Sequence, residues 1–235
     1  MTEPFFTYFG GKFRSAPHYP RPLYRTIVEP FAGAAGYALR YKGLDVILVE
    51  KNPTIAALWR YLITVSEKEI LMLPDVAEGI DVHTLSICSE AQSLIGFWLN
   101  KGNSSPCNIP SAWMRAGTHD TSFWGKTIRQ RIARQLRLIR HWTIIEGDYS
   151  LAPDVEATWF IDPPYEIAGR AYRYSSKDID YQHLATFAQT RKGQVVVCEN
   201  SGATWLPFIP FAHTKSAHGT SNEVIWESPG CSLFD

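Results

Sequence analysis

Four consecutive residues, Asp162, Pro163, Pro164 and Tyr165, are of types that can hold an aromatic amine. They follow the apolar run 158–161, so they stand where a buried strand would end. Two successive prolines keep the backbone extended or turned and remove two N–H donors, which leaves the turn lined with carbonyl oxygens. Such a turn accepts hydrogen bonds from an amine. The alternative is an ordinary turn after a buried strand.

The chemistry that these residues fit is the activation of an amine as a nucleophile. The lone pair of an aromatic amine is delocalised into its ring, so the nitrogen reacts poorly until it is drawn toward tetrahedral geometry. The Asp162 carboxylate and the Pro163 carbonyl can accept its two hydrogens, while Tyr165 can stack on the ring and align the nitrogen. Positive charge grows on the nitrogen as the new bond forms, and a neighbouring carboxylate stabilises that charge.

Three further segments place small or acidic residues after predicted strands. The run 26–28 leads into the glycine-rich segment 31–36, whose small residues let a ligand approach the backbone. The run 46–49 ends at Glu50. Its separation in sequence from the glycine-rich segment is about that expected for an acid that accepts hydrogen bonds from a ribose diol. Each pattern also has an explanation without a ligand. The glycine-rich segment can serve only tight strand–helix packing, and Glu50 can be a solvated acid.

The run 143–145 is followed by Asp148 and Tyr149. The carboxylate can accept from an adenine amino group while the tyrosine covers the ring. Asp148 can equally be a plain helix N-cap. Both interpretations stay open at this point.

The alternation of strand-like and helix-like segments predicts the fold class. Further apolar runs cover 158–161 and 194–198, and helical patterns cover 37–41 and 53–65. Five buried-type strands with helices between them indicate an α/β fold, Rossmann-like, with a mostly parallel sheet and helices on both faces. The segment 223–226 is expected to add an edge strand. In such sheets ligands bind beyond the carboxyl ends of the strands, where the candidate residues stand.

The middle segment, 85–141, interrupts this alternation and predicts an inserted, mainly helical subdomain. A helical stretch runs into Leu99, a polar loop covers 100–124, and a basic helix follows. In that helix one stripe is apolar, with Ile128, Ile132, Leu136 and Ile139. The expected domains are therefore 1–84 and 142–235, the two parts of a catalytic domain, and the insertion 85–141.

Composition excludes several classes of protein. The 235 residues are 45% hydrophobic and 20% charged, and no apolar run is long enough to span a bilayer. The N-terminus does not have the pattern of a secretory signal, so we expect a cytoplasmic protein. The four cysteines are far apart in the sequence, which argues against a zinc site and against a disulfide framework. We expect no metal and no membrane partner.

Charge is unevenly distributed, although 23 basic and 23 acidic residues balance overall. The segment from Phe97 to Trp142 contains eight basic residues and one acidic residue, so its net charge is +7. Arginines on one side of a helix suit contact with a nucleic-acid backbone, and they also suit a merely solvated face. The residues expected to contact nucleic acid are Lys101, Asn103, Arg115, Arg129, Arg134, Arg137 and Arg140.

The order of these motifs resembles that of the Dam-type DNA adenine-N6 methyltransferases, in a form typical of phages and mobile elements. The opening motif of that family is matched by 8–12, its glycine motif by 29–33, its ribose acid by Glu50 and its catalytic tetrad by 162–165. The resemblance implies a methyltransferase that uses S-adenosylmethionine, releases S-adenosylhomocysteine and acts on double-stranded DNA. It implies a donor site at Tyr8, Phe9, Gly11, Lys12, Phe31, Gly33, Glu50, Asp148, Tyr149 and Asp162.

Two departures from the family pattern limit what is carried over. Ala35 stands where the family often has its second glycine, and Gly36 follows one position later. The segment 100–108 lacks the aromatic-rich hairpin of the best-known members, so their target sequence is not implied.

The function that the resemblance implies is transfer of a methyl group to the N6 amine of a flipped-out adenine in DNA. Methylation of RNA adenine or of the N4 amine of DNA cytosine is the alternative within the same chemistry. A DNA-binding homologue without catalysis is the alternative of another class.

Overall fold

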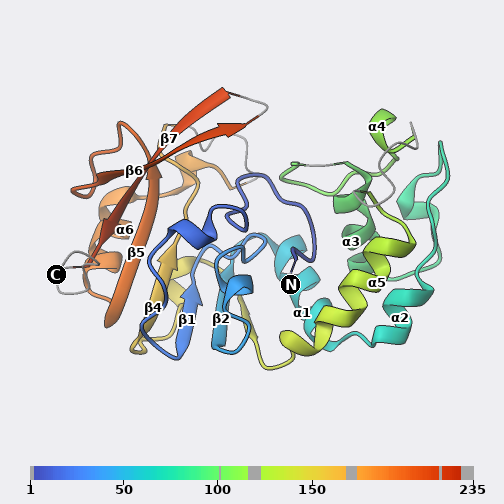
Figure 1. Cartoon of the computed structure of the whole chain (residues 1–235), viewed down its shortest axis with the longest axis horizontal. Coiled ribbons are helices and arrows are strands. Elements are labelled where there is room, and N and C mark those ends of the chain that lie inside the picture. The colour runs from blue at the N-terminus through green and yellow to red at the C-terminus, as the bar shows by residue number, and fades with distance from the viewer. Residues whose placement is uncertain (1–2, 101, 116–122, 168–173, 217–218, 229–235) are drawn as a thin grey trace. The chain divides into compact units, whose positions relative to one another are not determined.

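The computed structural model describes residues 3–100, 102–115, 123–167, 174–216 and 219–228 (Figure 1). By its internal contacts the chain divides into two compact units. Unit 1 comprises Met1–Ala16, Gly33–Gly43 and Pro53–Ile144, and unit 2 comprises Pro17–Ala32, Leu44–Asn52 and Ile145–Asp235. The helices α1 to α5 belong to unit 1. The sheet belongs to unit 2, apart from the start of β3.

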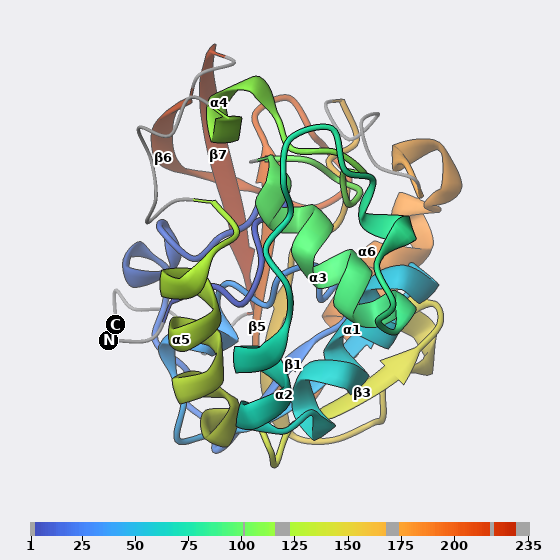
Figure 2. The same cartoon turned by 90° about the vertical axis from the view of Figure 1, so that its right-hand side faces the viewer.

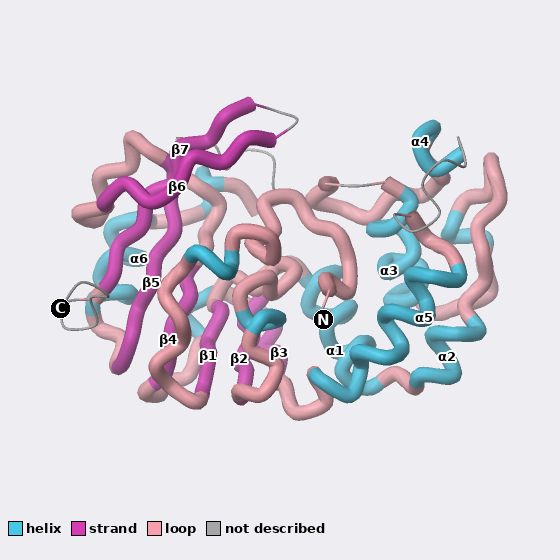
Figure 3. The backbone as a smooth tube through the Cα atoms, in the orientation of Figure 1, coloured by secondary structure: helices cyan, strands magenta, loops and turns pink. Residues whose placement is uncertain are grey.

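The sheet has seven strands in the order β3-β2-β1-β4-β5-β7-β6 (Figure 3). The strands are β1 (Thr26–Glu29), β2 (Asp45–Glu50), β3 (Thr143–Glu146), β4 (Ala157–Ile161), β5 (Gly193–Asn200), β6 (Ile209–Ser216) and β7 (Gly219–Glu227). β1 is parallel to β2 and β4, and β4 is parallel to β5. β7 is antiparallel to both β5 and β6. The predicted α/β class with a mostly parallel sheet is confirmed.

The five predicted strands correspond to β1 to β5. Near-continuous apolar runs mark strands buried on both faces, but β3 is an edge strand whose residues are exposed or partly buried. β4 is buried at all five of its positions. The prediction for 223–226 was wrong in one respect, since β7 lies inside the sheet and β6 is the edge strand. The sequence of β6 includes Pro210, a residue confined to edge strands and irregular positions, and its ladder with β7 is irregular between Pro210 and Ala212.

The core of unit 2 forms between the sheet and helix α6 (Tyr181–Gln189). Asp180 caps this helix, because its carboxylate accepts the N–H groups of Gln182 and His183. One side of the helix is buried in a cluster with residues of β1, β4 and β5, among them Trp159. The helix therefore holds the strands whose ends carry the predicted chemistry.

Unit 1 is helical, with α1 (Pro53–Thr64), α2 (Glu67–Met72), α3 (Ser89–Leu99), α4 (Ala112–Arg115) and α5 (Lys126–Gln135) (Figure 2). α1 packs against α3, and α2 packs against α5. The helices expected at 53–65 and up to Leu99 are confirmed. The four residues of the predicted apolar stripe on the basic helix are completely buried.

Aromatic side chains form the core of unit 1. The ring of Trp59 lies 5.5 Å from that of Phe6 and 5.7 Å from that of Trp142, measured between centroids. The rings of Phe6 and Phe97 are 5.1 Å apart. The core thus joins the N-terminal segment to α1 and α3.

The helix predicted after the glycine-rich segment is only one 3-10 turn, Ala38–Arg40. The Arg40 guanidinium donates two hydrogen bonds to the Phe13 carbonyl, at 2.9 and 2.7 Å, and lies over the Phe13 ring. These contacts hold the short turn against the N-terminal loop. The prediction of a regular helix here was therefore wrong.

Within the described residues, no helix is long and apolar enough to cross a membrane. The same residues include no group of three or more His, Cys, Asp or Glu side chains that could hold a metal ion.

Candidate active site

The strand order places a topological switch point between β1 and β4. From β1 the order continues to β2 and β3 on one side, and from β4 to β5 on the other. Ligands of open parallel sheets bind outside the carboxyl ends of the strands at such a point. Asp162 directly follows β4, so the predicted catalytic turn stands at this place.

Three hydrogen bonds within unit 2 hold the turn of Asp162 to Tyr165 and the residue after it. The Tyr181 hydroxyl donates to the Pro164 carbonyl at 2.5 Å, and the Tyr165 hydroxyl donates to Glu223 Oε1 at 2.7 Å. The Glu166 backbone N–H donates to Glu199 Oε2 at 3.1 Å. Because helix α6, strand β5 and strand β7 each supply one partner, the turn is fixed from three directions.

Burial has marked effects on the ionisable groups beside the turn. It raises the pKa of Tyr165 well above its ordinary value, and the nearby Asp162 carboxylate adds to that rise. Burial also raises the pKa of Glu199, against the effect of the donors Asn200 N–H, Glu166 N–H and the Trp205 indole. Tyr165 is therefore a neutral hydroxyl that donates.

The loops after β1, β2 and β3 lie side by side in unit 2. The Ala32 N–H donates to the Val49 carbonyl at 3.0 Å, and the Gly147 N–H donates to the Glu50 carbonyl at 2.9 Å. The Glu50 carboxylate is partly buried and accepts the Asn52 N–H at 2.8 Å. These bonds bring the ends of three strands, and with them Glu50, to one edge of the sheet.

Asp148 and Tyr149 are both engaged within unit 2. Asp148 caps a 3-10 turn through the Ser150 N–H and pairs with Lys51 at 3.2 Å. Burial alone would raise the pKa of Asp148, but the Ser150 N–H and the Lys51 ammonium lower it, and the net shift is downward. The N-cap interpretation of Asp148 is thus confirmed.

Tyr149 is 7% exposed, and its ring stacks on Phe31 with centroids 5.2 Å apart. Its hydroxyl lies 2.6 Å from His183 Nδ1. Burial raises the pKa of this tyrosine to about 12. Phe31 is only partly buried, so it is the aromatic ring of this pair with more surface left for a ligand.

The opening motif belongs to unit 1, and so does Gly33. The Gly11 N–H donates to the Tyr8 carbonyl at 3.2 Å, and the Phe9 N–H donates to the Asn103 carbonyl at 3.1 Å. A Cβ atom on Gly33 would lie 3.3 Å from the Tyr8 ring, so this ring packs on the glycine. The structure thus groups Tyr8, Gly11 and Gly33. Their role in donor binding, like that of Phe9 and Lys12, stays a prediction.

The departure at Ala35 has a structural counterpart. Ala35 adopts a φ of 49°, a left-handed conformation in which glycine is favoured. Gly36 is closely packed, because a Cβ there would lie 2.5 Å from the Phe13 nitrogen and 2.8 Å from the Lys12 nitrogen.

We expect Ala35→Gly to raise the free energy of unfolding by about 0.5–1 kcal/mol, since relief of left-handed strain outweighs the added freedom of the unfolded chain. Gly36→Ala should lower it, because the loop backbone would have to move. Urea denaturation of both variants beside the wild type measures the two effects. A loss of stability in Ala35→Gly would contradict this account.

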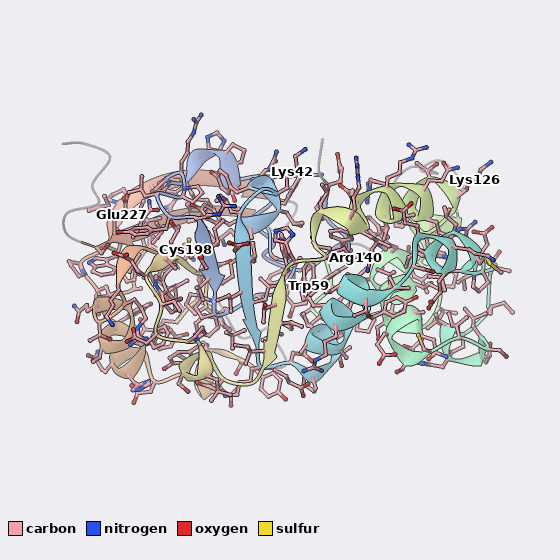
Figure 4. The ribbon with its side chains drawn as sticks, turned by 90° about the horizontal axis from the view of Figure 1, so that it is seen from below. Lys42, Trp59, Lys126, Arg140, Cys198 and Glu227 are labelled. Carbon is pink, nitrogen blue, oxygen red and sulfur yellow. The ribbon has the colours of Figure 1, made fainter. Side chains whose placement is uncertain are left out.

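Two of the arginines expected to contact nucleic acid have partners within unit 1. Arg129 pairs with Asp75. The Arg140 guanidinium, labelled in Figure 4, donates to the carbonyls of Ile63 and Val65 at the end of α1. The Arg129 side chain is mostly covered, whereas Arg140 stays exposed although its guanidinium donates within unit 1. A contact of either residue with nucleic acid stays a prediction. Helical periodicity predicts which side of the helix a residue occupies. It does not predict which distant groups a long arginine side chain contacts.

The other residues of this group differ in exposure. Arg134 and Arg137 are exposed. Asn103 is partly buried, and its side-chain amide donates to the Cys107 sulfur at 2.7 Å. Lys101 and the side chain of Arg115 lie outside the described residues.

Sequence reasoning missed the acids Glu199 and Glu223 and the hydroxyl of Tyr181. Glu199 follows the buried run 195–198, the same signal that singled out Glu50. Glu223 opens a run that was interpreted only as a strand. No pattern in the sequence indicates the hydrogen bond between Glu223 and Tyr165.

Comparison with models of protein families finds no match, and comparison with curated proteins finds none either. Among solved structures, the chain is similar to a conserved hypothetical protein of Streptococcus pyogenes, with a TM-score of 0.40 and 14% identity. The match covers 95% of this chain and 96% of that one. A likeness at this level carries no argument about function.

Proposed function

We propose that this protein is an S-adenosylmethionine-dependent methyltransferase that acts on the N6 amine of adenine in DNA. The observation that carries the proposal is the turn of Asp162 to Tyr165 at the carboxyl end of β4, beside the switch point and held by three hydrogen bonds. The sheet supports it as well, because an antiparallel β7 between β5 and β6 resembles the methyltransferase form of the Rossmann-like fold.

The contacts of the turn define how it would hold the amine. Tyr181 binds the Pro164 carbonyl, so the Pro163 carbonyl is the acceptor that we assign, together with the Asp162 carboxylate. Their pull on the two N–H groups localises the lone pair, and the Tyr165 ring stacks on the base. The carboxylate also stabilises the positive charge that develops on the nitrogen. The proton leaves to solvent after transfer, so no general base is assigned.

The residues at the neighbouring strand ends fit the adenosine part of the donor. Glu50 is a partly buried carboxylate, which suits a ribose diol, and Phe31 has partly exposed ring surface, which suits an adenine face. When bound, the donor supplies an electrophilic methyl group and leaves as a neutral thioether. Glu50 and Phe31 would position it at the edge of the sheet where Asp162 stands.

An adenine paired within a duplex cannot present its amine to a turn at the end of a strand. The target nucleotide must therefore be flipped out, at an unstacking cost of a few kcal/mol. Favourable contacts with the DNA backbone offset this cost, and we assign such contacts to the exposed Arg134 and Arg137.

We expect Arg134→Gln and Arg137→Gln to weaken DNA binding at all sequences. In a plot of the logarithm of the DNA association constant against the logarithm of the salt concentration, each change should reduce the steepness of the slope by about 1. The reason is that one phosphate fewer is neutralised. Arg140→Gln is the matched variant, since its guanidinium binds carbonyls at the end of α1. Arg140→Gln should instead lower the midpoint temperature of thermal unfolding. Fluorescence anisotropy at several salt concentrations measures the difference. Equal salt slopes for wild type and both exposed-arginine variants would contradict the assignment.

The direct test of the proposed function is transfer of labelled methyl from S-adenosylmethionine to unmodified DNA by the purified protein. Digestion to nucleosides should yield N6-methyladenine. Label in N4-methylcytosine, or in RNA offered in parallel, would favour the alternative amines. Binding to DNA without any transfer would indicate the non-catalytic homologue.

A further inference from the structure

Glu223 is a buried acid that neither the motifs nor the proposed reaction accounts for. It is 5% exposed and lies on β7, where Asn200 of β5 and Ala212 of β6 are its ladder partners. Strands on both sides therefore fix its backbone. A carboxylate in this position is costly to bury unless it has hydrogen-bond partners.

One partner of Glu223 is Tyr165, the aromatic residue of the turn of Asp162 to Tyr165. The Tyr165 hydroxyl donates to Glu223 Oε1 at 2.7 Å, the usual length for an O–H donor. The backbone end of Tyr165 is fixed separately, because the next residue donates its N–H to Glu199 and the Pro164 carbonyl accepts from Tyr181. The ring is therefore held at both ends.

The hydroxyl of a second tyrosine, Tyr19, also lies close to Glu223. Tyr19 is buried with its hydroxyl beside Glu223, and its ring stacks on Phe211 with centroids 4.7 Å apart. The register shift of β6 around this position leaves Phe211 without a ladder partner on β7. Packed aromatic groups thus limit how far the Glu223 side chain can move.

We propose that Glu223 is a positioning residue, which fixes the direction of the Tyr165 side chain through its hydroxyl so that the target base stacks with its amine at Asp162. This inference rests on the proposed function. The ring of a stacking residue can swing about its Cβ, and a fixed hydroxyl removes that freedom. A displacement of about 1 Å at a reacting group can slow a reaction about 100-fold.

The test is a double-mutant cycle on single-turnover methyl transfer, with Tyr165→Phe, Glu223→Ala and the two together. Each single change should slow transfer about 10- to 100-fold, and the double variant should be no slower than the slower single one, because both remove the same bond. Glu223→Gln keeps an acceptor oxygen and should stay within about threefold of the wild type. The dissociation constant and stoichiometry of S-adenosylmethionine binding, measured by calorimetry, should not change in any variant.

The matched control is Glu227→Ala, which removes a partly buried carboxylate from β7. Glu227, labelled in Figure 4, is four residues after Glu223, and strand periodicity puts both on one face. The Glu227→Ala variant should transfer methyl at the wild-type rate. The positioning role would be overturned if the rate losses of the two single variants multiplied in the double Tyr165–Glu223 variant. It would also be overturned if Glu223→Gln transferred methyl as slowly as Glu223→Ala. Absence of transfer by the wild type would overturn the proposed function and this inference with it, whereas an active wild type with a fully active Glu223→Ala overturns the inference alone.

Discussion

Asp162→Ala should abolish methyl transfer while the affinity for S-adenosylmethionine stays within a few fold of the wild type. The change removes the carboxylate that we propose accepts an amine hydrogen and stabilises the growing positive charge. Loss of one such group costs about 100- to 1000-fold in rate. Single-turnover transfer to DNA measures the rate, and calorimetry measures donor affinity.

Asp162→Asn is the control for the role of charge. Its amide oxygen can still accept one hydrogen bond, but it has no negative charge, so we expect a rate between those of the wild type and the alanine variant. An Asp162→Ala protein that retained more than a few per cent of the wild-type rate would contradict the role assigned to this residue.

Trp59→Ala should lower the free energy of unfolding by about 3–5 kcal/mol, the usual cost of removing a buried tryptophan. Trp59 is completely buried at the centre of the unit 1 core, and its indole N–H donates to the Gly33 carbonyl at 2.8 Å. Urea denaturation followed by circular dichroism measures the loss. The loss includes the hydrogen bond that holds the glycine-rich segment.

Trp59→Phe separates the two contributions. The ring keeps most of the packing against Phe6 and Trp142, while the Gly33 carbonyl loses its donor, so we expect a loss of about 1–3 kcal/mol. If the phenylalanine variant were as unstable as the alanine variant, the hydrogen bond rather than the packing would dominate at this position.

The strand ends were predictable because buried parallel strands have a strong signature. Each of β1 to β5 is a short apolar run that ends at a polar or glycine-rich segment, and parallel strands bring such ends to one edge. The same reasoning located Glu50 and Asp162. For Asp148 the sequence left two interpretations equal, and the structure shows the N-cap.

The contacts that hold the site were not predictable in the same way. The bonds from Tyr165 to Glu223 and from Tyr181 to Pro164 join residues 58 and 17 positions apart, and local patterns contain no information about such pairs. Arg140 illustrates the same limit. Helical periodicity indicates an exposed side chain, which the structure has, but it contains no information about the bonds to carbonyls at the end of α1. Edge strand β6 was missed because its proline and polar residues give no buried-strand signal.

The central claim is that the turn of Asp162 to Tyr165 methylates adenine in DNA. The most direct test is to express the chain and its Asp162→Ala variant in a host that lacks DNA methylation, and to map modified bases by sequencing the host DNA. We predict N6-methyladenine at one recurring sequence with the wild type and none with the variant. Unmodified DNA from wild-type cells that contain the folded protein, or modification confined to cytosine, would contradict the claim.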